Sequence, residues 1–203
     1  MKYNSKDIPN TKDRILNSTL YIIGKEGFQN VTIRKIAAAA DVNIASINYY
    51  FGSKEGVINE ALKCLTSKFM SSFEILQNKQ ITPIDRLRSF LRSYSDASVE
   101  YPDVFRNFVN QLIYNDDMKF DYIKFIEDEG VFKIKDILSE VTGIKDEEKL
   151  SMMALQGIAS LIFPVISDNQ TRKISNLNYK DKNVRYKYID VLIKSLQGNS
   201  ILM

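Results

Sequence analysis

The sequence of 203 residues contains no histidine and a single cysteine, Cys64. Without histidine the chain cannot build a histidine general base, a Cys-His pair or a His-containing zinc site, and one cysteine allows neither a four-cysteine zinc site nor a disulfide within the chain. The eight glycines form no phosphate-loop pattern. We therefore expect no enzyme and no cofactor or metal, and the low cysteine content fits a reducing cytoplasm.

Long apolar runs are also missing from the sequence. Residues 1–14 lack the apolar core of a signal peptide, and the most apolar stretch, residues 152–166, is interrupted by Gln156 and Ser160. Neither segment has the pattern of an export signal or a membrane span. We expect a cytoplasmic protein.

The net charge of +3 is small, but it is concentrated at one end of the chain. Residues 1–56 hold eight Lys or Arg against five Asp or Glu, and the rest of the chain holds equal numbers of both signs. Such an imbalance gains weight only where it coincides with a nucleic-acid-binding motif.

The segment 32–51 has the pattern of two short helices around a tight turn. Thr32 is a good N-cap for the first helix, and Asp41 and Asn43 are turn and capping residues before the second. On the second helix, Ile47 and Phe51 lie four apart and are expected to face inward, which leaves a surface of small and polar residues to face outward. The outward residues are Ala45, Ser46 and Tyr49.

A third helix is expected to follow directly. Gly52 ends the second helix, Ser53 can cap the next one, and Lys54 falls in its first turn, where exposed backbone amides attract anions. Two helices around a turn, with a cation positioned behind them for a phosphate, form a helix-turn-helix.

These residues resemble the DNA-binding pattern of the tetracycline-repressor (TetR) family of bacterial regulators. The matching segments are Thr32-Ile33-Arg34, Ala40-Asp41-Val42-Asn43, Ile47-Asn48-Tyr49-Tyr50-Phe51 and Ser53-Lys54-Glu55. Asp41 stands where the family usually has Gly, Asn43 where it has Ser, and Asn48 where it has the first Tyr. Asp tolerates a left-handed turn and Asn caps as well as Ser, so the expected geometry is kept.

The resemblance implies phosphate contacts by four residues: Thr32, Tyr49, Tyr50 and Lys54. Base contacts follow from side-chain chemistry, since Arg34 can pair with a guanine edge and Ala45 can meet a thymine methyl. Asn43 and Ser46 offer polar contacts. Ile44 is ambiguous, because its angle on the helix is close to that of the inward residues while its first-turn position matches a family position that reaches DNA.

The remainder of the chain predicts helices only, so the expected fold class is all-α, with about nine helices. We expect a helix-turn-helix DNA-binding domain at residues 9–56 and a helical regulatory and dimerisation domain at residues 57–203. Its helices are expected at residues 54–76, from Pro83, from Pro102, and at 122–141, 146–163 and 183–197, with a polar loop at 167–182.

The last two large helices are apolar over a wider arc than a surface helix needs. In the family that the chain resembles, the corresponding helices form a homodimer through a four-helix bundle. Small residues would permit close contact there: Ala154, Gly157, Ala159 and Ser160. The alternative is that both helices simply complete the core of a monomer.

Aromatic residues are frequent beyond residue 57, and most are expected to fill the core. A pocket for an apolar or amphipathic small molecule is the alternative for a few of them, because polar residues lie among them. The expected lining residues are Tyr94, Phe105, Phe108, Gln111 and Gln156. Gln156 has a second interpretation, a hydrogen bond across the dimer interface.

These features are compatible with three functions. The sequence favours a DNA-binding transcriptional repressor that a small molecule releases from a palindromic operator. A helical DNA-binding or protein-interaction module without an effector is the alternative. An all-α enzyme is the third, and it has only scattered carboxylates and lysines as catalytic groups.

Overall fold

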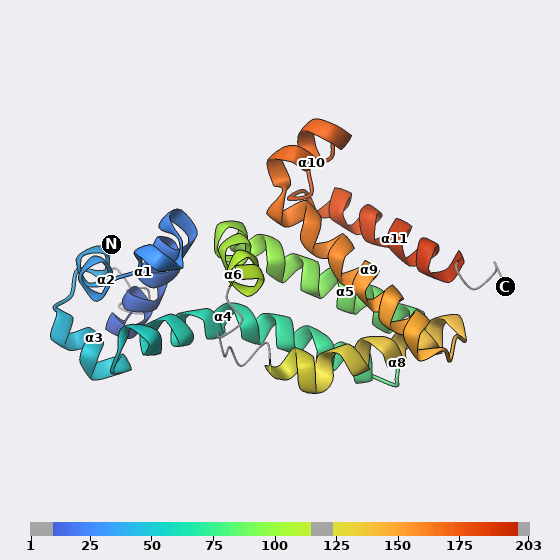
Figure 1. The fold of residues 1–203 in the computed structure, drawn as a ribbon, viewed down its shortest axis with the longest axis horizontal. Helices are drawn as coiled ribbons and strands as arrows, with labels where there is room; N and C mark the ends of the chain where they lie inside the picture. The colour runs from blue at the N-terminus through green and yellow to red at the C-terminus, as the bar shows by residue number, and fades with distance from the viewer. Residues whose placement is uncertain (1–9, 115–123, 199–203) are drawn as a thin grey trace, which may run out of the picture. The chain divides into compact units, whose positions relative to one another are not determined.

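The computed structural model describes residues 10–114 and 124–198. Within these residues the chain forms ten α-helices and no strand (Figure 1). The helices are α1 (Thr11–Glu26), α2 (Ile33–Ala40), α3 (Ile44–Phe51), α4 (Lys54–Glu74), α5 (Pro83–Glu100), α6 (Pro102–Tyr114), α8 (Val131–Thr142), α9 (Glu147–Ile166), α10 (Asp168–Ser175) and α11 (Lys182–Gly198). Short helical turns at Phe28–Asn30 and Ile75–Gln77 and a π-helical turn at Ile126–Gly130 complete the set. The predicted all-α class is confirmed.

The helices begin and end where capping chemistry allows. The side chains of Asn10, Thr82 and Asp146 each accept a hydrogen bond from the backbone N–H three residues later. Gly143 ends α8 with φ of 76°, a left-handed conformation that glycine adopts without strain. Each cap satisfies backbone groups that a helix end would otherwise leave unpaired.

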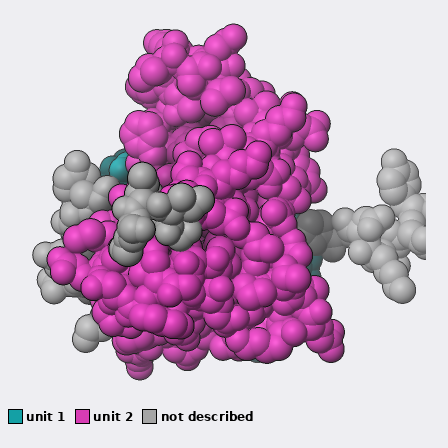
Figure 2. All heavy atoms as spheres, turned by 90° about the vertical axis from the view of Figure 1, so that its right-hand side faces the viewer, with its two compact units in different colours: residues 1–65, 103–116 teal, residues 66–102, 117–203 magenta. Residues whose placement is uncertain are grey.

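The chain divides into two compact units, which are coloured separately in Figure 2. The first unit holds residues 1–65 and 103–116, and the second holds residues 66–102 and 117–203. The division falls inside α4, between Leu65 and Thr66, and it assigns α6 to the first unit. Helix α6 therefore belongs to the same compact unit as the predicted DNA-binding motif.

The first unit is held together by an apolar core and by a polar contact between α1 and α6. Side chains of α1, α2, α3 and α4 form the core: Ile15, Ile23, Ile36, Ile47, Val57 and Ala61 are fully or almost fully buried. The Asn107 side-chain amide of α6 donates to the backbone oxygens of Ile23 at 2.9 Å and Gly24 at 3.4 Å, in the last turn of α1. The Ile23 oxygen also accepts from the Gly27 N–H at 3.0 Å, so α6 adds side-chain hydrogen bonds to an end of α1 that is already capped by its own backbone.

The second unit is built from α5, α8, α9, α10, α11 and the distal half of α4. An aromatic cluster lies at its centre: the Phe69 and Tyr94 rings are 4.7 Å apart, Phe73 is 4.9 Å from Phe90, and Phe125 meets Phe73 edge-on at 5.1 Å. Ring pairs at these distances add to the free energy gained from burial.

Two arginines of the second unit are almost fully buried, and each has an acidic partner. Arg86 of α5 binds Glu140 of α8, and Arg185 of α11 binds Asp96 of α5. Both guanidinium groups also donate to backbone oxygens, Arg86 to Leu76 and Arg185 to the residues just before α11. A buried charge is tolerated only when it is paired and hydrogen-bonded in this way. The pairs fix α8 and α11 against α5.

Two local features depart from the sequence prediction. The expected polar loop at 167–182 is wrong in its first half, because residues 168–175 form α10. Asp168 binds Arg172 one turn later and Lys180 from the following loop, and these contacts hold a helix that has no apolar periodicity. The helix expected at 122–141 begins outside the described residues, and from Ile126 to Gly130 it is a π-helical turn. Gly130 is buried there, and a Cβ atom at this position would lie 2.8 Å from Ile126 Cδ1.

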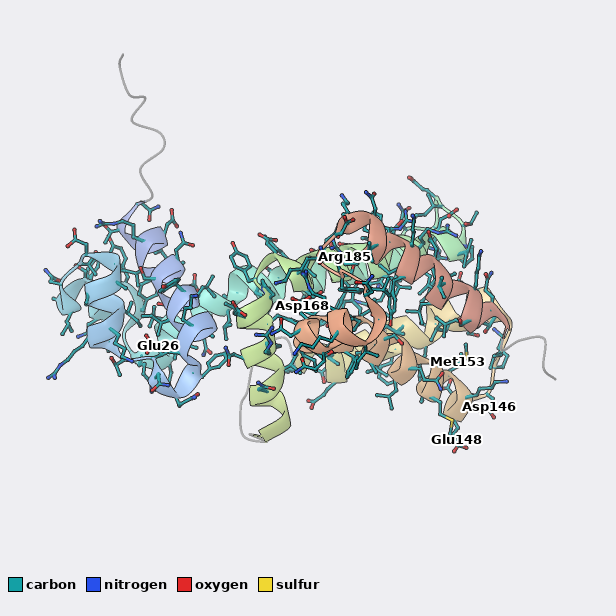
Figure 3. The ribbon with its side chains drawn as sticks, turned by 90° about the horizontal axis from the view of Figure 1, so that it is seen from above. Glu26, Asp146, Glu148, Met153, Asp168 and Arg185 are labelled. Carbon is teal, nitrogen blue, oxygen red and sulfur yellow. The ribbon has the colours of Figure 1, made fainter. Side chains whose placement is uncertain are left out.

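Helix α9 is a long and largely apolar helix. By length and composition alone it could cross a membrane, a test that core helices of globular proteins also pass. Its first turn carries charge, and its apolar residues divide between two faces. Figure 3 shows Asp146, Glu148 and Met153 at this end of the helix. Met153 is buried in the second unit, whereas Leu155 and Phe163 are exposed.

Candidate nucleic-acid interface

The turn between α2 and α3 has the geometry that its sequence predicts. The Thr32 hydroxyl accepts a hydrogen bond from the Lys35 N–H at 3.2 Å and caps α2. Asp41 adopts φ of 52°, the left-handed conformation, and ends α2. Asn43 Oδ1 accepts from the Ser46 N–H at 2.7 Å and from the Ser46 hydroxyl at 2.9 Å, and so caps α3. Both caps predicted from the sequence are confirmed.

The junction between α3 and α4 is equally tight. Gly52 has φ of 74°, and its N–H donates to the Asn48 oxygen at the end of α3. The Ser53 hydroxyl then accepts from the Gly56 N–H at 3.0 Å. Lys54 is the first residue of α4, so its ammonium group extends from a helix N-terminus whose backbone amides attract anions.

Helix α3 presents an exposed face opposite a buried one. Ile47 is fully buried, while Tyr49 is 84% exposed and Tyr50 is 46% exposed. Ile44 is 42% exposed, so of its two predicted orientations the structure has the outward one. The two tyrosine rings meet edge-on at 5.2 Å. The two tyrosines together therefore expose aromatic surface and two hydroxyl groups on α3.

The remaining predicted contact residues lie around that face. Thr32, Arg34, Asn43 and Ala45 are exposed, and Ser46 and Lys54 are half-buried. The structure thus brings the nine predicted residues together on α2, α3 and the start of α4: Thr32, Arg34, Asn43, Ile44, Ala45, Ser46, Tyr49, Tyr50 and Lys54. Whether they touch DNA stays a prediction.

Two cations of this surface are available for a new partner. Within the described part of the chain, Arg34 forms no hydrogen bond or ion pair. Lys54 has only Glu55 near its ammonium group, at 3.9 Å and without a hydrogen bond. Lys35, the neighbour of Arg34, is instead bound to Glu26 at the end of α1 (Figure 3 labels Glu26). Of the two adjacent basic residues of α2, Arg34 is therefore available to bind a partner, whereas Lys35 is already paired with Glu26.

The acidic residue beside Lys54 remains charged near neutral pH. The backbone N–H of Glu55 itself, the Ser53 hydroxyl and Lys54 hold the pKa of the Glu55 carboxyl below its usual range. A negative charge at the N-terminus of α4 occupies the position that suits an anion. The Glu55 carboxylate would therefore compete with a phosphate at the N-terminus of α4, if Lys54 binds one as predicted.

Sequence reasoning missed the contacts that support this surface. Lys12 of α1 donates to Glu60 of α4 at 3.2 Å, and its ammonium group lies 6.0 Å from the centre of the Phe51 ring. Lys12 and Glu60 are 48 residues apart. No local periodicity marks such a pair, so only the folded chain reveals it.

The residues predicted for a ligand pocket are not gathered by either unit alone. Tyr94 is buried in the aromatic cluster of the second unit, whereas Phe105 and Phe108 are buried in α6, within the first unit. Gln156 is exposed on α9, which fits its alternative position at a dimer surface. The side chain of Gln111 lies outside what the structure describes.

The N-terminal part of the chain matches a known family. Residues 15–61 match the family model of the bacterial regulatory proteins, tetR family. A Bacillus subtilis protein named "Probable HTH-type transcriptional regulator YttP" is 38% identical over 63 residues, which are 31% of this chain and 28% of that protein. IcaR of Staphylococcus aureus, named as a negative transcriptional regulator of the biofilm operon icaADBC, is 29% identical over 80 residues, 39% of this chain and 43% of IcaR.

The chain therefore spans less than half the length of these relatives. The fold is shared over a longer range. The TetR-family regulator PfmR of Thermus thermophilus aligns over 90% of this chain and 98% of its own, with a TM-score of 0.66 and 18% identity. The family model and the named relatives agree with the capped helix-turn-helix: residues 15–61 carry the DNA-binding domain of the bacterial regulatory proteins of the tetR family. The likeness to PfmR over the longer range is a likeness of fold.

Proposed function

We propose that the protein is a sequence-specific DNA-binding transcriptional regulator, and that it acts as a repressor from the cytoplasm. The observation that carries this proposal is the exposed face of α3, whose two tyrosines belong to the same helix-turn-helix as Arg34 of α2 and Lys54 at the start of α4. IcaR is named as a negative transcriptional regulator, which supports repression rather than activation as the role of this protein. Residues 9–56 would read DNA, and residues 57–203 would dimerise and respond to a ligand.

The geometry suits a major groove. Helix α3 is short and capped, and its outward residues Ala45 and Ser46 are small enough for the helix to approach base edges. Arg34 is the strongest candidate for a base contact, because its planar guanidinium can donate two hydrogen bonds to guanine. The Tyr49 and Tyr50 hydroxyls and the Lys54 ammonium group would bind the phosphates on either side.

A homodimer would give the protein two reading helices. The surface of α9 carries an apolar stripe with helical spacing, formed by Met152, Leu155, Ala159 and Phe163, and Val191 is exposed on α11. Every charged residue of α9 lies in its first turn, so the stripe continues to the end of the helix without a charge. We name this set the α9/α11 surface. It would pair with its copy across a two-fold axis and place two copies of α3 on a near-palindromic site.

Two connections could transmit ligand binding to the DNA-reading residues. Helix α4 runs without a break from Lys54, a predicted phosphate contact, to Glu74 beside the aromatic cluster. Helix α6 donates hydrogen bonds to the end of α1 through Asn107. A small apolar or amphipathic molecule that binds among the helices of residues 57–163 and moves either helix would therefore disturb the reading surface.

An effector-free regulator is the second candidate, and one observation favours it. The rings of Phe69, Phe73, Phe90 and Tyr94 pack against one another at 4.7 to 6.3 Å, which leaves no room between these rings for a ligand. In this case the second unit would act only as a dimerisation domain.

Gel-shift assays with the DNA upstream of the protein's own gene test the proposal. The wild type should bind one site tightly, and the double variant Arg34→Ala/Lys54→Ala should lose that complex. Lys173→Ala is the matched control, because it removes one exposed cation from α10 in the other unit. Equal binding by the wild type and the double variant would disprove the DNA interface. A thermal-shift screen of small apolar molecules, with each hit tested for release of the DNA, separates the two candidates.

A further inference from the structure

A small, partly open cavity lies in the second unit, between α5, α8, α9 and α11. Eleven residues line it, among them Phe90, Leu138, Met153, Gly157, Ile158 and Leu196. None of the eleven belongs to the predicted effector pocket or to the DNA-reading surface. All are buried except Ile158, which is half-buried at one side.

The cavity exists because α9 has its smallest residue at this point. Gly157 is buried, and a Cβ atom built on it would have no neighbouring atom within 4 Å. Ala154 lies one turn earlier on the same inward face, and Met153 borders the cavity nearer the start of the helix (Figure 3). A helix interior normally disfavours glycine by about 1 kcal/mol relative to alanine. Here a larger residue would fit, so neither a close packing contact nor a backbone conformation requires glycine.

The size and the lining determine what the cavity can hold. The centre of a water-sized sphere has about 20 Å³ in which to move, somewhat more than the roughly 10–15 Å³ that one water needs. A buried water also needs two to four polar partners, and every lining side chain is hydrocarbon or thioether. Water is therefore a poor occupant, and a polar ligand would lose its hydrogen bonds on entry.

We propose that this cavity is a binding site for one small apolar group, such as a compact hydrocarbon or the terminal methyl end of an aliphatic chain. Such a group would regain the dispersion contacts that the missing side chain of Gly157 leaves unmade. The site does not depend on DNA binding, because every residue that forms it lies in the second unit.

Xenon is a suitable probe, because it is apolar, compact and without hydrogen-bonding groups. Xenon NMR of the full-length wild-type protein should show a saturable shift, and xenon should raise the melting temperature, since a ligand that binds only the folded state stabilises it. Gly157→Val should abolish the saturable shift by filling the cavity. Ser151→Val adds the same β-branched side chain on the exposed side of α9 and should keep the shift.

Gly157→Ala is the second variant, in case valine disturbs the fold. It should reduce the xenon affinity while the circular dichroism spectrum stays that of the wild type. Two results would overturn the proposal: no saturable shift in the wild type, or the same shift in wild type and in folded Gly157→Val or Gly157→Ala protein.

Discussion

The surface of α2 and α3 and the α9/α11 surface both expose large side chains, but they expose different atoms. On α2 and α3 the exposed groups are the tyrosine rings with their hydroxyls and the guanidinium of Arg34. On α9 and α11 they are the hydrocarbon side chains of residues such as Leu155 and Val191. Hydroxyls and cations can replace water around an anionic partner, whereas hydrocarbon gains only by leaving water. The two surfaces therefore support two different proposed partners, a nucleic acid for α2 and α3 and a second copy of the chain for α9 and α11.

The largest expected effect comes from placing charge on the apolar surface. Leu155→Glu combined with Val191→Glu should convert a dimer into a monomer, because like charges would face each other across the two-fold axis. Loss of bivalent binding should reduce affinity for a palindromic site by about 100-fold or more. Sedimentation and gel-shift assays measure both effects. A monomeric wild type, or a dimeric double variant, would contradict the assignment of this surface.

Arg34→Ala should produce the next largest effect. Loss of a two-hydrogen-bond contact to guanine should cost about 1–3 kcal/mol on the cognate site and little on unrelated DNA. Titrations with cognate and scrambled duplexes separate the two cases. Lys35→Ala is the control on the same helix, since Glu26 already engages Lys35. An equal loss on both duplexes would make Arg34 a phosphate contact.

The third prediction concerns the ion pairs of Asp168, which stabilise α10 next to the C-terminal end of α9. Burial would raise the pKa of its carboxyl, but Arg172 and Lys180 outweigh burial and lower it. A depressed folded-state pKa gives stability that is present above the unfolded value of about 3.9 and is lost as the pH falls through the folded value. Asp168→Asn should cost about 1–2 kcal/mol at neutral pH.

The difference between wild type and Asp168→Asn should therefore shrink as the solution is acidified below about pH 4. Thermal melts of both proteins across this range measure it. A constant difference at all pH values would show that the carboxylate charge of Asp168 does not stabilise the fold.

Lys54→Ala should weaken binding to all DNA sequences alike. Removal of one phosphate contact should reduce the dependence of log affinity on log salt by about one unit, without a change in sequence preference. Salt titrations on two duplexes measure the slope. Glu55→Gln should act in the opposite direction, because it removes the competing charge at the N-terminus of α4. An unchanged salt dependence in the Lys54→Ala protein would show that Lys54 does not contact a DNA phosphate.

The smallest expected effect comes from a substitution on the buried face of α9. Gly157→Ala should stabilise the protein by about 0.5–1 kcal/mol, because alanine favours the helix and its methyl group enters open space. Gly143→Ala is the matched control: it also has space, but its φ of 76° disfavours alanine, so it should destabilise. Denaturant unfolding of both variants measures the difference. Destabilisation by Gly157→Ala would mean that the cavity is already closed.

The sequence predicted the local geometry of the DNA-reading motif well, because that geometry depends on residues a few positions apart. Thr32, Asp41 and Asn43 each act on backbone groups within their own turn. The sequence was less successful in predicting which face of a uniformly apolar helix is exposed. Gly157 was expected at a dimer contact, yet it points into the core, and the neighbouring Leu155 lies on the outward stripe. When most positions are apolar, periodicity no longer identifies the exposed face.

Contacts between segments that are far apart in the chain could not be predicted from the sequence, for a different reason. Lys180 pairs with Asp168 at the start of α10, and Phe73 of α4 lies against the π-helical turn at Gly130. Neither partner is specified by local propensity, which tertiary contacts often override.

The bond between Asn107 and the end of α1 has a consequence for how the protein is made. Its two ends lie 84 residues apart in the chain, and the segment between them includes α5 of the second unit. During synthesis the helix-turn-helix leaves the ribosome long before α6 does, so the end of α1 lacks the Asn107 hydrogen bonds until α6 has been made. The DNA-reading unit is therefore completed late, by a helix that is translated after α5, and a fragment that stops at residue 65 would lack it.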